Sequence, residues 1–134
     1  MPAKFTLGKN ERLKRRKIIE QLFAEGKSIA VFPLRVNFIF VTSLTVPLQA
    51  GFSVSARTFK RAADRNRIKR LMREAYRLQK GLLYESLHKK QQQMALFVIY
   101  TGKELPDYKT VSEKKGVVLN KLTKVVNEIP APHA

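Results

Sequence analysis

The residues best suited to chemistry in this sequence lie between positions 57 and 77. This segment holds seven arginines and two lysines against two acids, which is a third of the 27 cationic side chains in the chain. At about 100° per residue, cations recur once per helical turn from Arg65 to Arg77. Arginine is suited to paired hydrogen bonds with phosphate oxygens. The segment therefore predicts a helix that presents cations to the backbone of a nucleic acid.

The other side of this helix is apolar and is expected to face a core. It carries Ile68, Leu71, Met72, Ala75 and Leu78. We expect Asp64 to be the N-cap and the helix to run to about Lys80, where Gly81 ends or kinks it. A charge run is usually a solvated face, but the excess of arginine and the scarcity of neighbouring acids favour phosphate binding.

Composition points to the same class of partner. The 134 residues carry a formal charge of +17, with 44% hydrophobic residues and no cysteine. Such a chain attracts polyanions and can still bury a core. The lack of cysteine excludes disulfides, thiolate zinc sites and a cysteine nucleophile. With no bilayer-length apolar run and no signal-peptide pattern at the start, we expect a cytoplasmic protein without a membrane or small-molecule partner. One domain over 1–134, frayed at 1–8 and 128–134, is expected.

No catalytic or metal-binding constellation is visible in the sequence. The two histidines, His88 and His133, lie in a polar stretch and near the chain end, and the ten acids are scattered. No pair of carboxylates is spaced for a two-metal site. We therefore expect no catalytic residue and no metal ligand in this chain, and a surface position for His88.

Periodicity predicts an α+β fold in which helices pack against a small sheet as an α/β sandwich, in the order α-β-β-β-α-β-α. The first helix is expected over 10–25 with Asn10 as N-cap, and three strands over 28–32, 34–42 and 48–55. After the basic helix, residues 82–93 are expected to be helical. The apolar run 94–101 predicts a strand buried on both faces. A last helix is expected to open at Ser112, with Val118, Leu122, Val125 and Val126 turned inward and Lys114, Lys121 and Lys124 outward.

Residues 51–77 closely resemble the signature of the bacterial ribonuclease P protein component. The matching positions are Ser53, Val54, Ser55, Ala62, Arg65, Asn66, Arg67, Lys69, Arg70, Arg73 and Glu74. At lower grade the resemblance covers most of the chain, including the first helix and the strand at 94–101. Thr58 and Lys60 depart from residues common in the family, and the 82–93 stretch looks longer than usual.

This resemblance implies the protein subunit of a ribonucleoprotein endonuclease. In the family, a catalytic RNA removes the 5′ leader of precursor tRNA with magnesium ions, which are bound mainly by the RNA subunit. The protein binds that RNA and touches the leader. The implied partners are therefore the catalytic ribonuclease P RNA and precursor tRNA, and magnesium is the implied cofactor.

Two surfaces follow from the resemblance. The expected RNA-binding residues are Arg57, Lys60, Arg61, Arg65, Asn66, Arg67, Lys69, Arg70 and Arg73. Asn66 could bond to the backbone at the helix start or lie near phosphates and hydrated metal, and we expect a mixed role. Glu74 is expected to orient Arg70 or Arg77 through an ion pair along the helix.

The expected leader cleft lies between the first helix and the sheet. Its residues are Ile19, Phe23, Asn37, Ile39 and Phe40. Aromatic side chains can stack on single-stranded bases, yet an aromatic residue on an amphipathic helix is more often core. Both readings stay open for Phe23, and Phe40 leans toward the core.

Two other classes compete on composition. A ribosomal protein is also small, basic and free of cysteine, and a helix-turn-helix regulator also carries a basic helix. The ordered spacing of residues 65–74 argues against the first. The expected strand and loop before the basic helix argue against the second.

Overall fold

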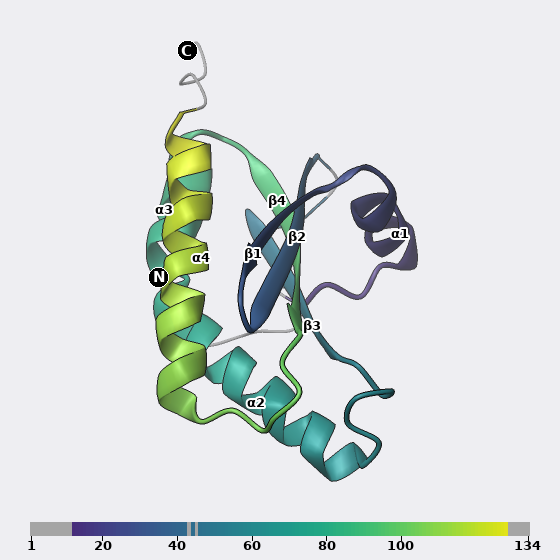
Figure 1. Cartoon of the computed structure of the whole chain (residues 1–134). Helices are drawn as coiled ribbons and strands as arrows, with labels where there is room; N and C mark the ends of the chain where they lie inside the picture. Colours follow the sequence, from purple (N-terminus) through teal and green to yellow (C-terminus); the bar gives the residue numbers. More distant parts are fainter. Residues whose placement is uncertain (1–11, 43, 45, 129–134) are drawn as a thin grey trace.

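The computed structural model describes residues 12–42, 44 and 46–128, which form helices around one four-stranded sheet (Figure 1). The elements are α1 (Arg16–Glu25), β1 (Lys27–Val31), β2 (Leu34–Val41), β3 (Leu48–Val54), α2 (Ala62–Gln79), α3 (Gly81–Lys89), β4 (Gln93–Tyr100) and α4 (Tyr108–Asn127). The α+β class and the element order expected from the sequence are confirmed, and the helical stretch predicted over 82–93 is present in part as α3, which ends at Lys89.

The strands lie in the order β1-β2-β4-β3, so the last strand of the chain is inserted between β2 and β3. β2 pairs antiparallel with β1 and with β4, whereas β3 pairs parallel with β4. A parallel pair needs a long crossover, and α2 and α3 supply it. The basic helix α2 is therefore part of the connection that joins the neighbouring strands β3 and β4.

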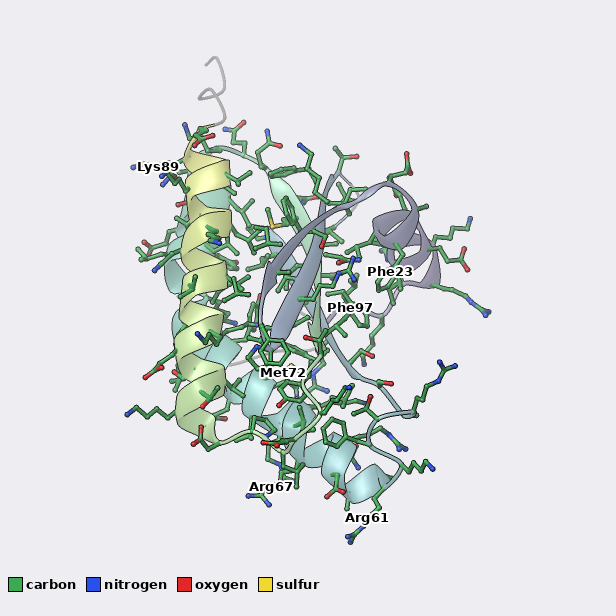
Figure 2. All side chains as sticks on the ribbon, viewed as in Figure 1. Phe23, Arg61, Arg67, Met72, Lys89 and Phe97 are labelled. Atoms are coloured by element: carbon green, nitrogen blue, oxygen red, sulfur yellow. The ribbon has the colours of Figure 1, made fainter. Side chains whose placement is uncertain are left out.

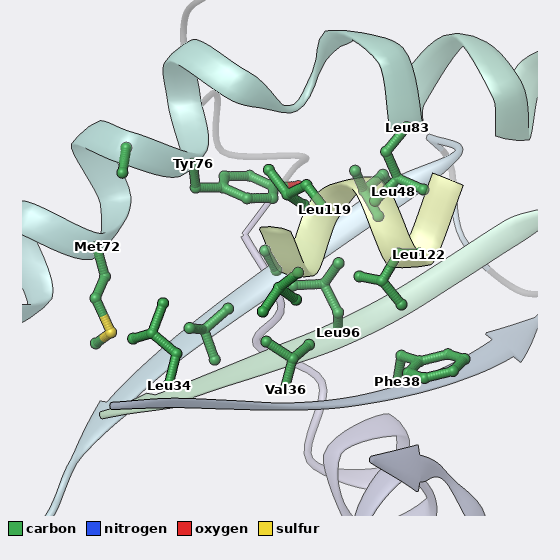
Figure 3. Packing of buried hydrophobic residues seen from close by; sticks show 14 of the residues in the cluster. Leu34, Val36, Phe38, Leu48, Met72, Tyr76, Leu83, Leu96, Leu119 and Leu122 are labelled. Atoms are coloured by element: carbon green, nitrogen blue, oxygen red, sulfur yellow. The ribbon is translucent and has the colours of Figure 1, made fainter. Parts of the chain in front are cut away.

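Helices cover both faces of the sheet, and each face has its own core. Helices α2, α3 and α4 lie on one side and α1 lies on the other (Figure 1). The larger core fills the space under α2, α3 and α4 (Figure 3) and includes Leu34, Val36, Phe38, Leu48, Met72, Tyr76, Leu83, Leu96, Leu119 and Leu122. The smaller core lies under α1 and includes Leu13, Ile18, Leu22, Leu44 and Ala95. Strand β4 is thus buried along one face, but on the other face only Ala95 is fully buried.

The first helix is shorter than expected. It begins at Arg16, because the chain before it follows the edge of β3 instead: Arg12 forms a bridge with Ala50, and the Leu13 amide donates to the Ala50 carbonyl at 3.0 Å. The expected N-cap Asn10 lies outside the described residues, as do the ends predicted to be frayed except Glu128, which is the C-cap of α4.

The other predicted helix boundaries also needed correction. Helix α2 begins at Ala62, so Asp64 lies in its first turn rather than at the N-cap. A carboxylate in the first turn interacts favourably with the helix dipole. Helix α4 begins four residues before the expected Ser112. There the side chain of Asp107 accepts a hydrogen bond from the Thr110 amide at 2.8 Å. This bond holds the pKa of Asp107 below its ordinary value.

The inward stripe of α4 contains a lysine that sequence reasoning missed. Val118, Leu122 and Val126 are buried as expected, and Lys115, one turn before Val118, is buried with them at 0% exposure. Its Nζ lies 5.0 Å from the centre of the Phe52 ring. Nζ has no hydrogen-bond partner among the described residues, and burial lowers the pKa of Lys115 well below its ordinary value.

Candidate nucleic-acid interface

Helix α2 is amphipathic, but its exposed row is displaced from the one predicted. Ile68, Met72, Ala75 and Tyr76 are buried, Leu71 is partly buried, and Leu78, expected to face inward, is 44% exposed. The exposed polar positions are Asn66, Arg67, Arg70, Arg73 and Glu74, while Arg65, Lys69 and Arg77 are half-buried. Figure 2 shows Arg67 pointing away from the body of the protein and Met72 pointing into it.

Arg65 does not extend the exposed row. Its Nη1 donates to the carbonyl oxygens of Phe59 at 2.8 Å and Lys60 at 2.9 Å, both in the segment just before the helix. The guanidinium is thus turned back toward the loop. Its expected contact with RNA stays a prediction, but the structure gives it two protein partners that the sequence did not indicate.

The loop between β3 and α2, which we call the basic loop (residues 55–61), has a fixed backbone path. Ser55 Oγ accepts hydrogen bonds from the amides of Arg57 (3.2 Å) and Thr58 (3.4 Å), and the Phe59 amide donates to the Ser55 carbonyl at 3.0 Å. The Phe59 side chain is buried, with its ring centre 5.9 Å from that of Tyr100.

The basic loop leaves its cations outside while its aromatic residue is buried. Arg57, Lys60 and Arg61 are all exposed. Arg61 is also the N-cap of α2, and no side chain caps that helix end. The loop and the exposed row of α2 therefore form one continuous cationic surface, with Arg61 at its tip and Arg67 farther along the helix (Figure 2). This surface brings together most of the residues that the sequence predicted to bind RNA, whereas the predicted residues Arg65 and Lys69 are half-buried beside it.

Glu74 was expected to orient Arg70 or Arg77 through an ion pair along α2. It forms an ion pair with Arg77 one turn later, which confirms the expected pairing along the helix. The same contact raises the pKa of Arg77. Glu74 therefore neutralises Arg77 and leaves the exposed arginines of α2 without a described ion-pair partner.

On the opposite face of the sheet, α1 and the strands form a second surface. The alternation of strand side chains places Asn37 and Ile39 of β2 on this face, beneath Ile19 and Phe23 of α1. Four of the five predicted cleft residues therefore lie on one side of the sheet. Phe23 is 49% exposed, so its ring is neither fully core nor free.

Phe40 is the exception, and its assignment to the cleft is wrong. It packs against the larger core, under α2, α3 and α4. The reason is the two-residue period of a strand: Asn37 and Ile39 share one face, so Phe40 must point to the other.

Phe97 is a residue of this surface that sequence reasoning missed. It pairs in register with Asn37 on one side and Gly51 on the other, and its ring centre lies 5.4 Å from that of Phe23 (Figure 2). A Cβ at position 51 would come within 2.9 Å of the Phe97 ring, so any larger residue there would force the ring to shift. Phe97 belongs to a continuous apolar run, which concealed the fact that one face of β4 is partly open.

Polar groups complete this second surface. Asn37 Oδ1 is buried and has no hydrogen-bond partner among the described residues. Arg35, one step along the same face of β2, is exposed, and its Nε donates to Ser28 Oγ at 3.3 Å. The surface thus presents two aromatic rings and a cation at its margin. These are groups that can hold a single-stranded nucleotide.

Other kinds of functional feature can be checked in the described part of the chain. Within residues 12–42, 44 and 46–128, no three His, Asp or Glu side chains come together in a way that could hold a metal ion. His88 is exposed, as expected. Of the helices in these same ranges, none combines the length and the apolar character needed to cross a membrane. Helix α2 follows a strand and a loop, which contradicts the helix-turn-helix alternative.

Comparison with known proteins identifies the family. The family model for ribonuclease P matches residues 7–123. The ribonuclease P protein component of Porphyromonas gingivalis strain W83 is 37% identical over 131 residues, spanning 97% of this chain and 93% of the relative. That of Chlorobium phaeobacteroides is 32% identical over 120 residues, spanning 81% of this chain and 82% of the relative.

Solved structures agree with this result. The ribonuclease P protein from Thermotoga maritima has 31% identity and a TM-score of 0.62, with 85% of this chain and 96% of that chain covered. The Staphylococcus aureus protein has a TM-score of 0.67 over 87% of this chain and 98% of that one, and at 21% identity it supports the fold alone. With a family model over most of its length and relatives above 30% identity, this chain belongs to the ribonuclease P protein family.

Proposed function

We propose that this chain binds the catalytic ribonuclease P RNA and the 5′ leader of precursor tRNA, and so assists magnesium-dependent removal of the leader by the RNA. Membership in the family supports a part in the tRNA-processing enzyme. The observation that carries the rest is that the two surfaces lie on opposite faces of one sheet: the arginines of α2 on one side, and the rings of Phe23 and Phe97 on the other.

The cationic surface is the side that would meet the catalytic RNA. Arg67, Arg70 and Arg73 are exposed on α2, and within the described part of the chain no acid pairs with them. Their guanidinium groups can each make two hydrogen bonds to a phosphate. A folded RNA presents closely spaced phosphates, so an array at one-turn spacing can neutralise several at once and release their counterions.

The second surface would hold the leader. A leader is single-stranded and exposes base faces, which the partly open rings of Phe23 and Phe97 can stack against. Arg35 at the margin can meet the leader backbone. In the helical parts of tRNA the bases are paired and stacked, so they offer no free faces to such a surface.

Magnesium enters this proposal through the RNA. When bound there, magnesium would activate water and neutralise charge at the scissile phosphate. The described residues hold no cluster of three ligands, so this chain would contribute only by binding and orienting the RNA partners. We further propose that the chain acts as a single cytoplasmic domain, supported by the family match over residues 7–123.

Reconstitution tests the proposal. Precursor tRNA is incubated with the purified full-length protein, with a bacterial ribonuclease P RNA, and with both, over a magnesium titration. We expect the protein alone to be inactive and to lower the magnesium that the RNA requires. Cleavage by protein that has been freed of RNA with nuclease, or an RNA activity that the protein leaves unchanged, would contradict the proposal.

A further inference from the structure

Arg65 differs from the other arginines of α2 in what it touches. One nitrogen, Nη1, donates to two successive carbonyl oxygens, those of Phe59 at 2.8 Å and Lys60 at 2.9 Å. By contrast Arg67 and Arg70 are exposed and have no side-chain hydrogen bond to the described residues. Carbonyls at the end of a loop need donors, and here a charged donor satisfies both.

The start of the basic loop is held in a matching way. Ser55 Oγ accepts from the amides of Arg57 and Thr58, at 3.2 Å and 3.4 Å. Between the two ends, the buried Phe59 ring packs near Tyr100. The backbone from 55 to 60 is therefore tied to the protein at its beginning, at its middle and at its end.

We propose that Arg65 is a positioning residue, which with Ser55 holds the basic loop in one shape so that Arg57, Lys60 and Arg61 meet RNA phosphates without first being ordered. This inference rests on the proposed function, because it assigns a role within the same cationic surface. A loop that is already ordered loses less conformational freedom on binding, so its contacts yield more affinity.

Charge-preserving and charge-removing variants separate positioning from direct contact. In Arg65→Lys the net charge is kept, but the ammonium is a compact point charge on a flexible stem and does not reproduce the planar donor of arginine. In Arg65→Gln the charge is lost as well. Arg67→Lys is the matched control, because it makes the same change at an exposed arginine of the same helix.

The first readout needs no RNA. Full-length proteins are treated briefly with trypsin under native conditions, and cleavage after Arg57, Lys60 and Arg61 is quantified by mass spectrometry beside a melting curve. We expect both Arg65 variants to be cut about tenfold faster in the loop, since two hydrogen bonds hold it. Cleavage elsewhere, and the whole pattern of Arg67→Lys, should match the wild type.

The second readout is affinity for a bacterial ribonuclease P RNA over a salt series. We expect Arg65→Lys and Arg65→Gln to weaken binding by a similar factor, about tenfold, with the wild-type slope against salt. If Arg65 instead contacts a phosphate, the lysine variant would keep the charge and would bind more tightly than the glutamine variant. The glutamine variant would then flatten the log–log slope by about 0.7–0.9. That pattern, with unchanged loop cleavage, would overturn the inference.

Two further outcomes are decided by the same design. If wild-type protein fails to bind the RNA, the proposed function falls, but the trypsin arm still shows whether Arg65 holds the loop. If the Arg65 variants melt early throughout, Ser55→Ala takes their place, since it releases the other end of the loop. Faster loop cleavage and weaker RNA binding at the wild-type salt slope support the inference, and wild-type behaviour of Ser55→Ala contradicts it.

Discussion

Replacing Phe23 by alanine should weaken binding of the leader without unfolding the protein. Its ring is 49% exposed and makes one ring contact in the described structure, with Phe97 at 5.4 Å. Half the burial of a phenylalanine and one tilted ring pair together stabilise the protein by about 1–3 kcal/mol. A base stacked on an aromatic residue contributes about 1–3 kcal/mol to binding. The variant should therefore fold, and it should bind a leader about 5- to 150-fold more weakly.

The assay compares two ligands with each protein. The affinities of precursor tRNA with a leader of several nucleotides and of mature tRNA are measured for the holoenzyme assembled with Phe23→Ala, beside a melting curve. Only the precursor should lose affinity. Phe32→Ala is the matched control, because this phenylalanine is 73% exposed in the turn between β1 and β2, and it should not distinguish the ligands. Equal losses for both ligands in Phe23→Ala, with a large drop in melting temperature, would refute the leader assignment.

Three further outcomes are expected. Replacing Arg67, Arg70 and Arg73 together by alanine should preserve the melting temperature, weaken binding to the catalytic RNA, and flatten the log–log salt slope by about 0.7–0.9 for each lost phosphate contact; an unchanged slope would make the helix face merely solvated. Met72→Ala, at a fully buried position of α2, should lower the free energy of unfolding by about 2–5 kcal/mol in urea titration, and a loss below 1 kcal/mol would contradict that packing. Burial lowers the pKa of Lys115 in the folded chain below its ordinary value of 10.5. At a pH between the lowered pKa and 10.5, the unfolded chain binds more protons than the folded chain. Stability therefore rises with pH over this range. Lys115→Met should therefore stabilise the protein at pH 7 by about 1–3 kcal/mol, and the gain should shrink toward pH 10.5; a gain independent of pH would show that Lys115 keeps an ordinary pKa.

The sequence predicted the elements well because periodicity records which side of each element is buried. Alternation in β2 was enough to assign one face to the larger core. The same alternation already places Phe40 on the core face, since a residue three positions from Asn37 cannot share its face. The helix starts were harder to predict, because Asp64 and Ser112 both have the chemistry of a cap. Which residue caps depends on where tertiary contacts let the helix begin.

The details of the site depended on contacts that no local pattern contains. Phe97 belongs to the second surface because it pairs with Asn37 and Gly51, which lie on two strands distant from it in sequence. Arg65 looked like one more cation on a helix, and only the path of the preceding loop turns its side chain toward two carbonyls. Lys115 lies on an apolar stripe, but a lysine is almost never fully buried without a partner, so its type argued against its place.

Strand β3 sets a fixed spacing between the two surfaces. Gly51, under the Phe97 ring, and Ser55, at the start of the basic loop, are four residues apart on one extended segment. At about 3.3 Å per residue this is roughly 13 Å. Inserting one residue would lengthen the span by a quarter and turn the glycine to the opposite side of the sheet. The length of this strand therefore fixes the distance between the two surfaces, and inserting one residue would disturb both proposed RNA-binding surfaces at once.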